Sequence, residues 1–78
     1  MTEYQNEFSV AVGTQSDFTL SGSYTPGGGH TAVFLNGVAQ SLLAGDYTES
    51  GASAIHFTVP VAPQSPTVPS IVKVIYFA

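Results

Sequence analysis

A tight-turn signal in the middle of the chain constrains its fold more than any other feature. Asn36-Gly37 stands between two short runs of mainly apolar residues. A type I′ turn needs positive φ at both central positions, and asparagine and glycine tolerate that conformation best. We therefore expect residues 31–35 and 38–42 to form a β-hairpin around this turn.

Further strands are expected on both sides of the hairpin. Residues 8–12, 18–24 and 53–59 alternate apolar with small or polar side chains, a pattern typical of strands with one buried face. Gly22 falls at an inward position, which indicates a bulge or a close backbone approach. Several short strands with regular turns favour an all-β fold, a small antiparallel β-sandwich or barrel-like sandwich of about six or seven strands.

The last run, residues 71–77, is apolar on both faces except at Lys73. Its remaining side chains divide into two sets by alternation. One set can fill a core (Val72, Val74 and Tyr76), and the other points away from it (Ile71, Ile75 and Phe77). A strand buried on both sides needs a second layer, either the other sheet or another subunit. We favour another subunit, which makes the outward set a candidate partner-binding surface.

Two segments outside the regular strands set the expected domain limits. Residues 60–69 hold four prolines, which cannot donate to a strand ladder and indicate an extended crossing from one sheet to the other. Residues 1–7 are polar, so we expect a flexible or docking N-terminal arm. The β-sandwich domain is then residues 8–78.

Composition indicates a protein that covers itself with a partner. A 78-residue chain sits near the lower limit for folding alone, and this one has no cysteine with which to form a disulfide. Charged residues make up 8% of it, where about 25% is typical of soluble domains. Because soluble monomers rarely expose large apolar patches, we expect a homo-oligomer.

The charge balance and the hydropathy pattern exclude two partner classes. One lysine against five acidic residues leaves almost nothing to neutralise phosphates, so we expect no nucleic-acid binding. No apolar run is long enough to span a membrane, and the N-terminus has neither the basic nor the apolar region of a secretion signal. We therefore expect no membrane partner.

No catalytic or metal-binding constellation emerges from the sequence. The two histidines, His30 and His56, fall in different segments, and no serine stands in a G-x-S-x-G frame. Asp46 and Glu49 are best explained as a turn former and a solvated charge. We expect no enzyme activity, no cofactor and no metal site.

Binding residues are less constrained by the sequence. Sugars stack on exposed aromatic faces, and Tyr24, Tyr47 and the glycine loop ending at His30 are candidate contacts for such a ligand. Each tyrosine can equally be a half-buried strand residue with a solvated hydroxyl. Tyr47 and His30 therefore join the outward set of the last strand as candidate partner contacts.

Four segments together resemble a module common in tailed-bacteriophage virion proteins: Val33-Phe34-Leu35-Asn36-Gly37-Val38-x-Gln40, Asp46-Tyr47-Thr48-Glu49-x-Gly51, Ile55-x-Phe57-x-x-Pro60 and Val72-x-Val74-x-Tyr76. The resemblance spans residues 18–77. In that family such modules are small β-sandwiches of tail fibres, head fibres and capsid decorations. The chain departs from the family at residues 60–69, where its connection is longer and stiffer.

The resemblance implies a virion structural protein that assembles as a homo-oligomer, often a trimer. Because the module here makes up the whole chain, it suits a capsid decoration or cement protein better than a fibre. Its partner would be the major capsid protein, and it would be made in the host cytoplasm and located on the capsid surface. The alternatives are a host-attachment or carbohydrate-binding module of a tail fibre or spike, and a tail connector protein.

Overall fold

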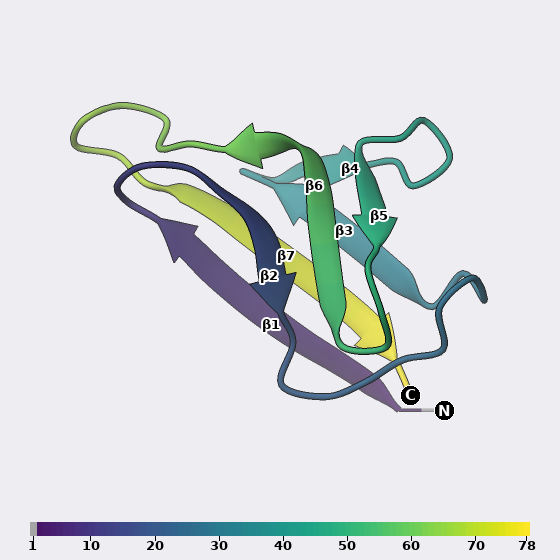
Figure 1. Cartoon of the computed structure of the whole chain (residues 1–78). Coiled ribbons are helices and arrows are strands. Elements are labelled where there is room, and N and C mark those ends of the chain that lie inside the picture. The colour runs from purple at the N-terminus through teal and green to yellow at the C-terminus, as the bar shows by residue number, and fades with distance from the viewer. Residues whose placement is uncertain (1) are drawn as a thin grey trace.

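The computed structural model describes residues 2–78, and all regular structure in this range is β-strand. The strands are β1 (Glu3–Val10), β2 (Gln15–Thr19), β3 (Thr31–Leu35), β4 (Val38–Gln40), β5 (Tyr47–Glu49), β6 (Ala54–Val61) and β7 (Ser70–Phe77). They form a four-stranded sheet in the order β1-β7-β3-β4 and a three-stranded sheet in the order β2-β6-β5, with every pairing antiparallel (Figure 1). The expected all-β sandwich is confirmed.

The predicted hairpin forms around the expected turn. Asn36 has a φ of 51° and Gly37 a φ of 82°, as a type I′ turn requires. Asn36 also fastens this turn to the start of β7, because its Oδ1 accepts the Ile71 N–H at 2.8 Å and its own N–H donates to the Ile71 carbonyl at 2.9 Å. The turn thus fixes where β7 enters the sheet.

The proline-rich connection crosses between the sheets as predicted. The strand before it, β6, pairs with β2 and β5, while β7 after it lies between β1 and β3. Within the connection, Ser65 and Val68 exchange two backbone hydrogen bonds of 3.2 and 3.3 Å. Two eight-residue strands of opposite sheets are joined in this way.

The core lies between the two sheets and takes the inward set of β7 as predicted. Val72, Val74 and Tyr76 have no exposed surface. The other buried apolar residues are Val10, Phe18, Leu20, Tyr24, Val33, Tyr47, Ile55, Phe57 and Val61. Phe18 bridges the sheets, with its ring centroid 5.2 Å from that of Phe8 and 5.4 Å from that of Phe57.

Gly22 makes the close approach that its inward position indicated. A Cβ added there would lie 3.0 Å from the Tyr76 hydroxyl oxygen and 3.4 Å from the ring. The segment after β2 can therefore pass directly over the Tyr76 ring because position 22 has no side chain.

The expected N-terminal arm is wrong for the described residues 2–7. β1 begins at Glu3 and pairs in unbroken register with β7, from Glu3 opposite Phe77 to Val10 opposite Ser70. Beyond the strand, Thr2 and Ala78 exchange two further backbone hydrogen bonds, of 2.8 and 3.0 Å. This ladder holds the segment, so the sandwich includes it, while Met1 lies outside the described residues.

Two apolar residues expected to face inward are instead exposed. β1 ends at Val10, which leaves Val12 85% exposed. Val59 is 75% exposed and lies in the part of β6 between His56 and Val61, where the register with β2 shifts.

Candidate docking face

The outward side chains of β7 lie together on the surface of the four-stranded sheet that faces away from the core. Ile71, Ile75 and Phe77 alternate with the buried set, and Ile71 is 38% exposed while the other two are half-buried. On β3, Phe34 is the neighbour of Lys73 across the ladder and is also half-buried. We call these five residues of β7 and β3 the outer face.

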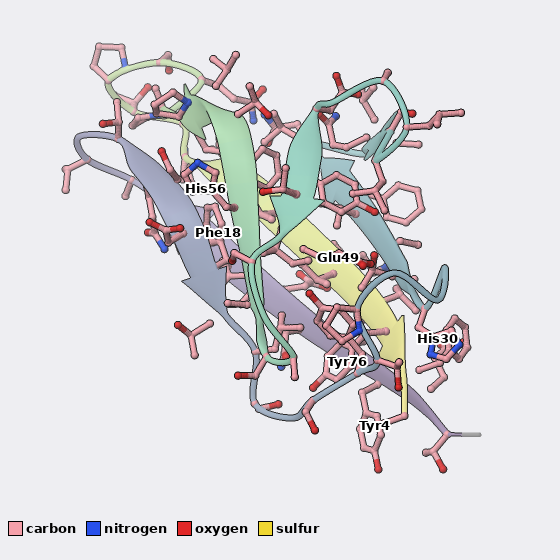
Figure 2. All side chains as sticks on the ribbon, turned by 45° about the vertical axis from the view of Figure 1, so that its right-hand side comes forward. Tyr4, Phe18, His30, Glu49, His56 and Tyr76 are labelled. Atoms are coloured by element: carbon pink, nitrogen blue, oxygen red, sulfur yellow. The ribbon has the colours of Figure 1, made fainter. Side chains whose placement is uncertain are left out.

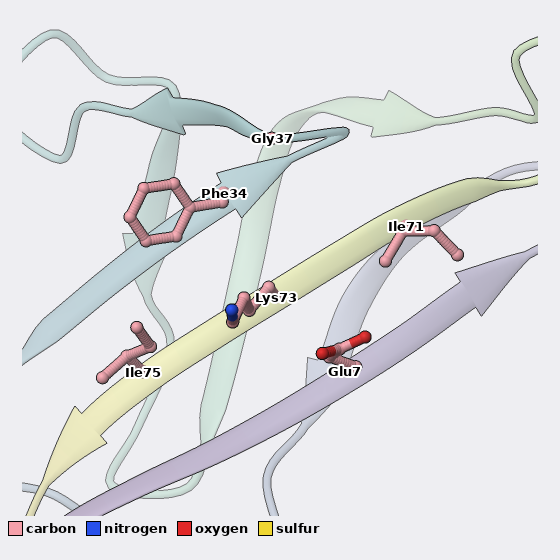
Figure 3. Close-up of a pocket in the computed structure, with 6 residues that line it drawn as sticks. All are labelled: Glu7, Phe34, Gly37, Ile71, Lys73 and Ile75. Carbon is pink, nitrogen blue, oxygen red and sulfur yellow. The ribbon is translucent and has the colours of Figure 1, made fainter.

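A shallow groove of about 330 Å³ runs over this face (Figure 3). Its lining combines apolar side chains with one residue of each charge: Glu7, Phe34, Gly37, Ile71, Lys73 and Ile75. Each part has a structural origin, since β7 supplies three residues, the hairpin two and β1 one. Glu7 and Phe34 lie opposite Lys73 on its two sides.

The electrostatics of the groove are simple. Lys73 is the only lysine or arginine in the chain, and it stands in the middle of the apolar stripe. Its aliphatic stem extends the apolar surface while its ammonium remains available to a carboxylate. The arrangement suits an apolar partner surface that carries an acidic group.

Exposed apolar residues continue past the edge of the sheet. Val38 on β4 is 64% exposed, and Leu43 in the following turn is fully exposed. Asp46 holds that turn, because its Oδ2 accepts the Ser41 N–H at 2.8 Å. Val38 pairs with Leu35, which packs against the core, so Val38 lies on the inner side of the sheet edge and not on the outer face.

Tyr47, expected as a partner contact, is instead a core residue. It is only 2% exposed, and its hydroxyl lies 3.1 Å from the Thr31 hydroxyl in a hydrogen bond. The reason is its pairing opposite Phe57 on β6, whose side chain also points inward. A partner on the surface cannot reach its ring.

His30 lies half-buried immediately before β3 (Figure 2). Its carbonyl accepts the Phe77 N–H at 3.0 Å, which places it beside the end of β7. Its ring packs against Gly28, where an added Cβ would be 3.2 Å from Nε2. Nδ1 is buried and has no hydrogen-bond partner among the described residues.

The glycine loop is held by a carboxylate that the sequence suggested was merely solvated. Glu49 accepts the Gly27 N–H at 2.7 Å through one oxygen and the Thr31 hydroxyl at 2.6 Å through the other. Charge-assisted bonds of this kind are stronger than neutral ones. The loop is therefore tied to β3 and β5.

Tyr24 lies under the same loop and is only 4% exposed. Its hydroxyl donates to the Ala54 carbonyl at 2.8 Å. Burial, together with the nearby Glu49 and Tyr47, raises the pKa of Tyr24 from 10.0 to about 12. Of the four tyrosines only Tyr4 presents a substantial surface, at 46% exposure, so a tyrosine platform for a sugar is lacking.

A histidine and a carboxylate meet on the opposite side of the molecule. His56 Nδ1 lies 2.8 Å from Asp17 Oδ1, and both side chains are well exposed, at 43% and 75%. Within the described range, no hydroxyl is hydrogen-bonded to the His56 ring. The pair links β2 to β6, and we assign it no chemistry beyond that link.

In residues 2–78 no three His, Asp or Glu side chains are grouped so that they could hold a metal ion. The same range contains no helix long and apolar enough to cross a membrane.

The outer face contains residues that the sequence did not single out. Ile71, Ile75 and Phe77 were expected, but Phe34 joins this face, and Glu7 the groove beside it, only through the pairing of β7 with both neighbours. No protein-family model matches the chain, and comparisons with curated proteins and with solved structures found no match.

Proposed function

We propose that this protein is a non-enzymatic structural component of a bacteriophage virion, a decoration protein that docks on the assembled head through its outer face and stabilises it. The observation that carries this proposal is the apolar stripe Ile71, Ile75 and Phe77 on the side of β7 that the chain leaves uncovered. The family resemblance supplies the virion context.

The size of the molecule is compatible with docking through one face. It measures 39 × 23 × 19 Å, so its broad side covers on the order of 900 Å², close to the ~800 Å² that each partner contributes to a standard interface. A protein that binds the assembled shell but not its disassembled subunits adds its binding free energy to the stability of the shell. The proposed activity therefore needs complementary surface and no catalysis.

Co-sedimentation with expanded heads of the phage that encodes the chain tests this proposal. The variant Ile75→Glu places a charge in the groove, whereas Val59→Glu makes the same change at a 75% exposed position on the other sheet. We expect wild type and Val59→Glu to sediment with the heads and Ile75→Glu to remain in the supernatant. Circular dichroism checks that both variants are folded.

Two results would count against the proposal in different ways. If the wild-type protein does not sediment with heads, the decoration function is abandoned. If Ile75→Glu sediments as well as wild type does, the protein docks through another surface.

The carbohydrate-binding alternative has lost two of its expected contacts, because Tyr24 and Tyr47 are buried. The connector alternative uses the same outer face. Co-sedimentation with purified tails distinguishes a connector from a head decoration protein, since a connector should bind tails only and a decoration protein heads only.

A further inference from the structure

Strand β1 is the longest open edge in the molecule. It is an outer strand of the four-stranded sheet, eight residues long, without proline, glycine or a register irregularity (Figure 1). The other outer strands are poorer templates, because β4 and β5 have three residues each and β2 has a shifted register. A long regular edge is a ready template for another strand.

The hydrogen-bond pattern shows which residues of β1 face this open edge. Thr2 and Ala78 exchange both of their backbone bonds, so they form a hydrogen-bonded pair. Such pairs recur at every second residue of an antiparallel ladder. The even-numbered residues of β1 therefore point their N–H and C=O groups to β7, and those of Glu3, Gln5, Glu7 and Ser9 point outward.

We propose that β1 pairs antiparallel with β1 of a second copy of this chain, about a two-fold axis at Asn6. Residues on the same side of the sheet must lie opposite one another, so the axis passes through a residue position and not between two. Centred on Asn6, residues 3–9 of each copy pair, and their odd-numbered members supply the outward backbone groups of both strands.

In this register the side chains of β1 lie opposite suitable partners on β1 of the second copy. Glu3 falls opposite Ser9 of the other copy, and Gln5 falls opposite Glu7. The Gln5 amide already donates to Glu7 within its own strand at 3.3 Å, so the two side chains are suited to bond each other across the pair as well. Each acidic residue thus meets a neutral hydrogen-bonding partner.

On the inner side, Tyr4 falls opposite Phe8, an aromatic pair of the kind that stabilises adjacent strands. The pairing covers the exposed part of Tyr4, whose ring already stacks on Tyr76 at 5.5 Å. The only other register that pairs as many strand residues, 4–10, is centred on Glu7 and places Glu7 directly against its own copy. Like charges directly opposite are destabilising, which favours the axis at Asn6.

A second copy is therefore the occupant that this edge fits best. In this register the two glutamates of β1 face neutral residues of the second copy and the two aromatic residues face each other, so no other segment is needed. Pairing gives a small domain without disulfides the additional buried surface that such domains need.

Analytical ultracentrifugation over a dilution series, at low salt, tests this pairing with substitutions at Gln5. Gln5→Glu places acidic residues opposite each other twice per dimer, whereas Gln5→Lys creates two opposite-charge pairs at the same positions. We expect the first to weaken the dimer by about tenfold and the second to strengthen it. Thr48→Glu and Thr48→Lys, on an exposed position of β5, control for net charge and should leave the dissociation constant unchanged.

Gln5→Pro gives a second, independent test. It removes an outward N–H but no bond to β7, so the fold is retained and the dimer is lost. Hydrogen exchange should show Gln5, Glu7 and Ser9 amides protected in the wild-type dimer only, while the even-numbered amides of β1 are protected in the monomer too.

A monomer at every concentration, or a trimer, would overturn the proposal. A dimer that is insensitive to all three Gln5 substitutions would do so as well, because its interface would lie elsewhere. These experiments measure self-association and not binding to heads, so failure of the edge pairing and failure of the decoration function are distinguishable.

Discussion

The stability of this protein should fall steeply between pH 10 and pH 12 because of one buried tyrosine. In the unfolded chain Tyr24 has a pKa of 10.0, and in the folded chain burial, Glu49 and Tyr47 raise this pKa to about 12. Below pH 10 Tyr24 is protonated in both states and does not change the free energy of unfolding. As the pH rises through this window, Tyr24 loses its proton first in the unfolded chain, so unfolding becomes more favourable by up to about 3 kcal/mol.

The substitution Tyr24→Phe makes this reasoning testable because it removes the titrating group. At pH 7 the variant should be less stable by about 1 kcal/mol, because the Ala54 carbonyl loses the hydrogen bond of 2.8 Å. Near pH 12 the wild type should be the less stable of the two, because ionisation of Tyr24 stabilises its unfolded chain and the variant has no such group. The two stability curves are expected to cross near pH 11.

Urea unfolding at half-unit pH steps from 7 to 12 measures both curves. Contributions of the other tyrosines are common to both proteins and cancel in the difference. Tyr4→Phe, which removes the hydroxyl of a tyrosine that is 46% exposed, is the matched control for the chemical change itself. A difference between wild type and Tyr24→Phe that stays constant with pH would refute the argument.

Three other substitutions probe contacts on which the fold depends, each measured by urea unfolding at pH 7. Gly22→Ala should destabilise by about 1 kcal/mol, since its Cβ would press on the fully buried Tyr76. Asn36→Ala should be about 1–2 kcal/mol less stable than Asn36→Gly, because both lose the bond to Ile71 but only alanine is strained at a φ of 51°. Glu49→Gln should cost about 1–2 kcal/mol and speed hydrogen exchange in the glycine loop, since a carboxamide presents one acceptor where the carboxylate presents two.

The parts of this fold that depend on local chemistry were predictable from the sequence. Alternation alone separated the inward and outward sets of β7, because neighbouring side chains of a strand point to opposite faces whatever the strand pairs with. The Asn36-Gly37 turn was equally predictable, since few other residue pairs accept its backbone angles. The outward set on the outer face follows from the same rule.

The parts that depend on distant segments were not predictable. The first residues of β1 form a strand because β7, at the other end of the chain, pairs with them, and their polar sequence carries little sign of it. Tyr47 belongs to a strand of only three residues, too short for alternation to show which way its ring points. Tyr47 is buried because it pairs with Phe57 on the neighbouring strand, whose side chain points into the core.

The outer face and the β1 edge belong to the same sheet, and this links the two proposals. A two-fold axis perpendicular to the sheet leaves both outer faces on the same side of the joined sheets, with the acidic side chains of β1 between two apolar stripes. A dimer would then present two docking faces in one direction to a repeating lattice, and its second contact would form at a high effective concentration. Gln5→Pro leaves the groove residues untouched, so each monomer should still bind heads. Its affinity for heads should be lower than that of the wild-type dimer, which can bind through two faces. Equal head binding by wild type and Gln5→Pro would show that each copy docks alone.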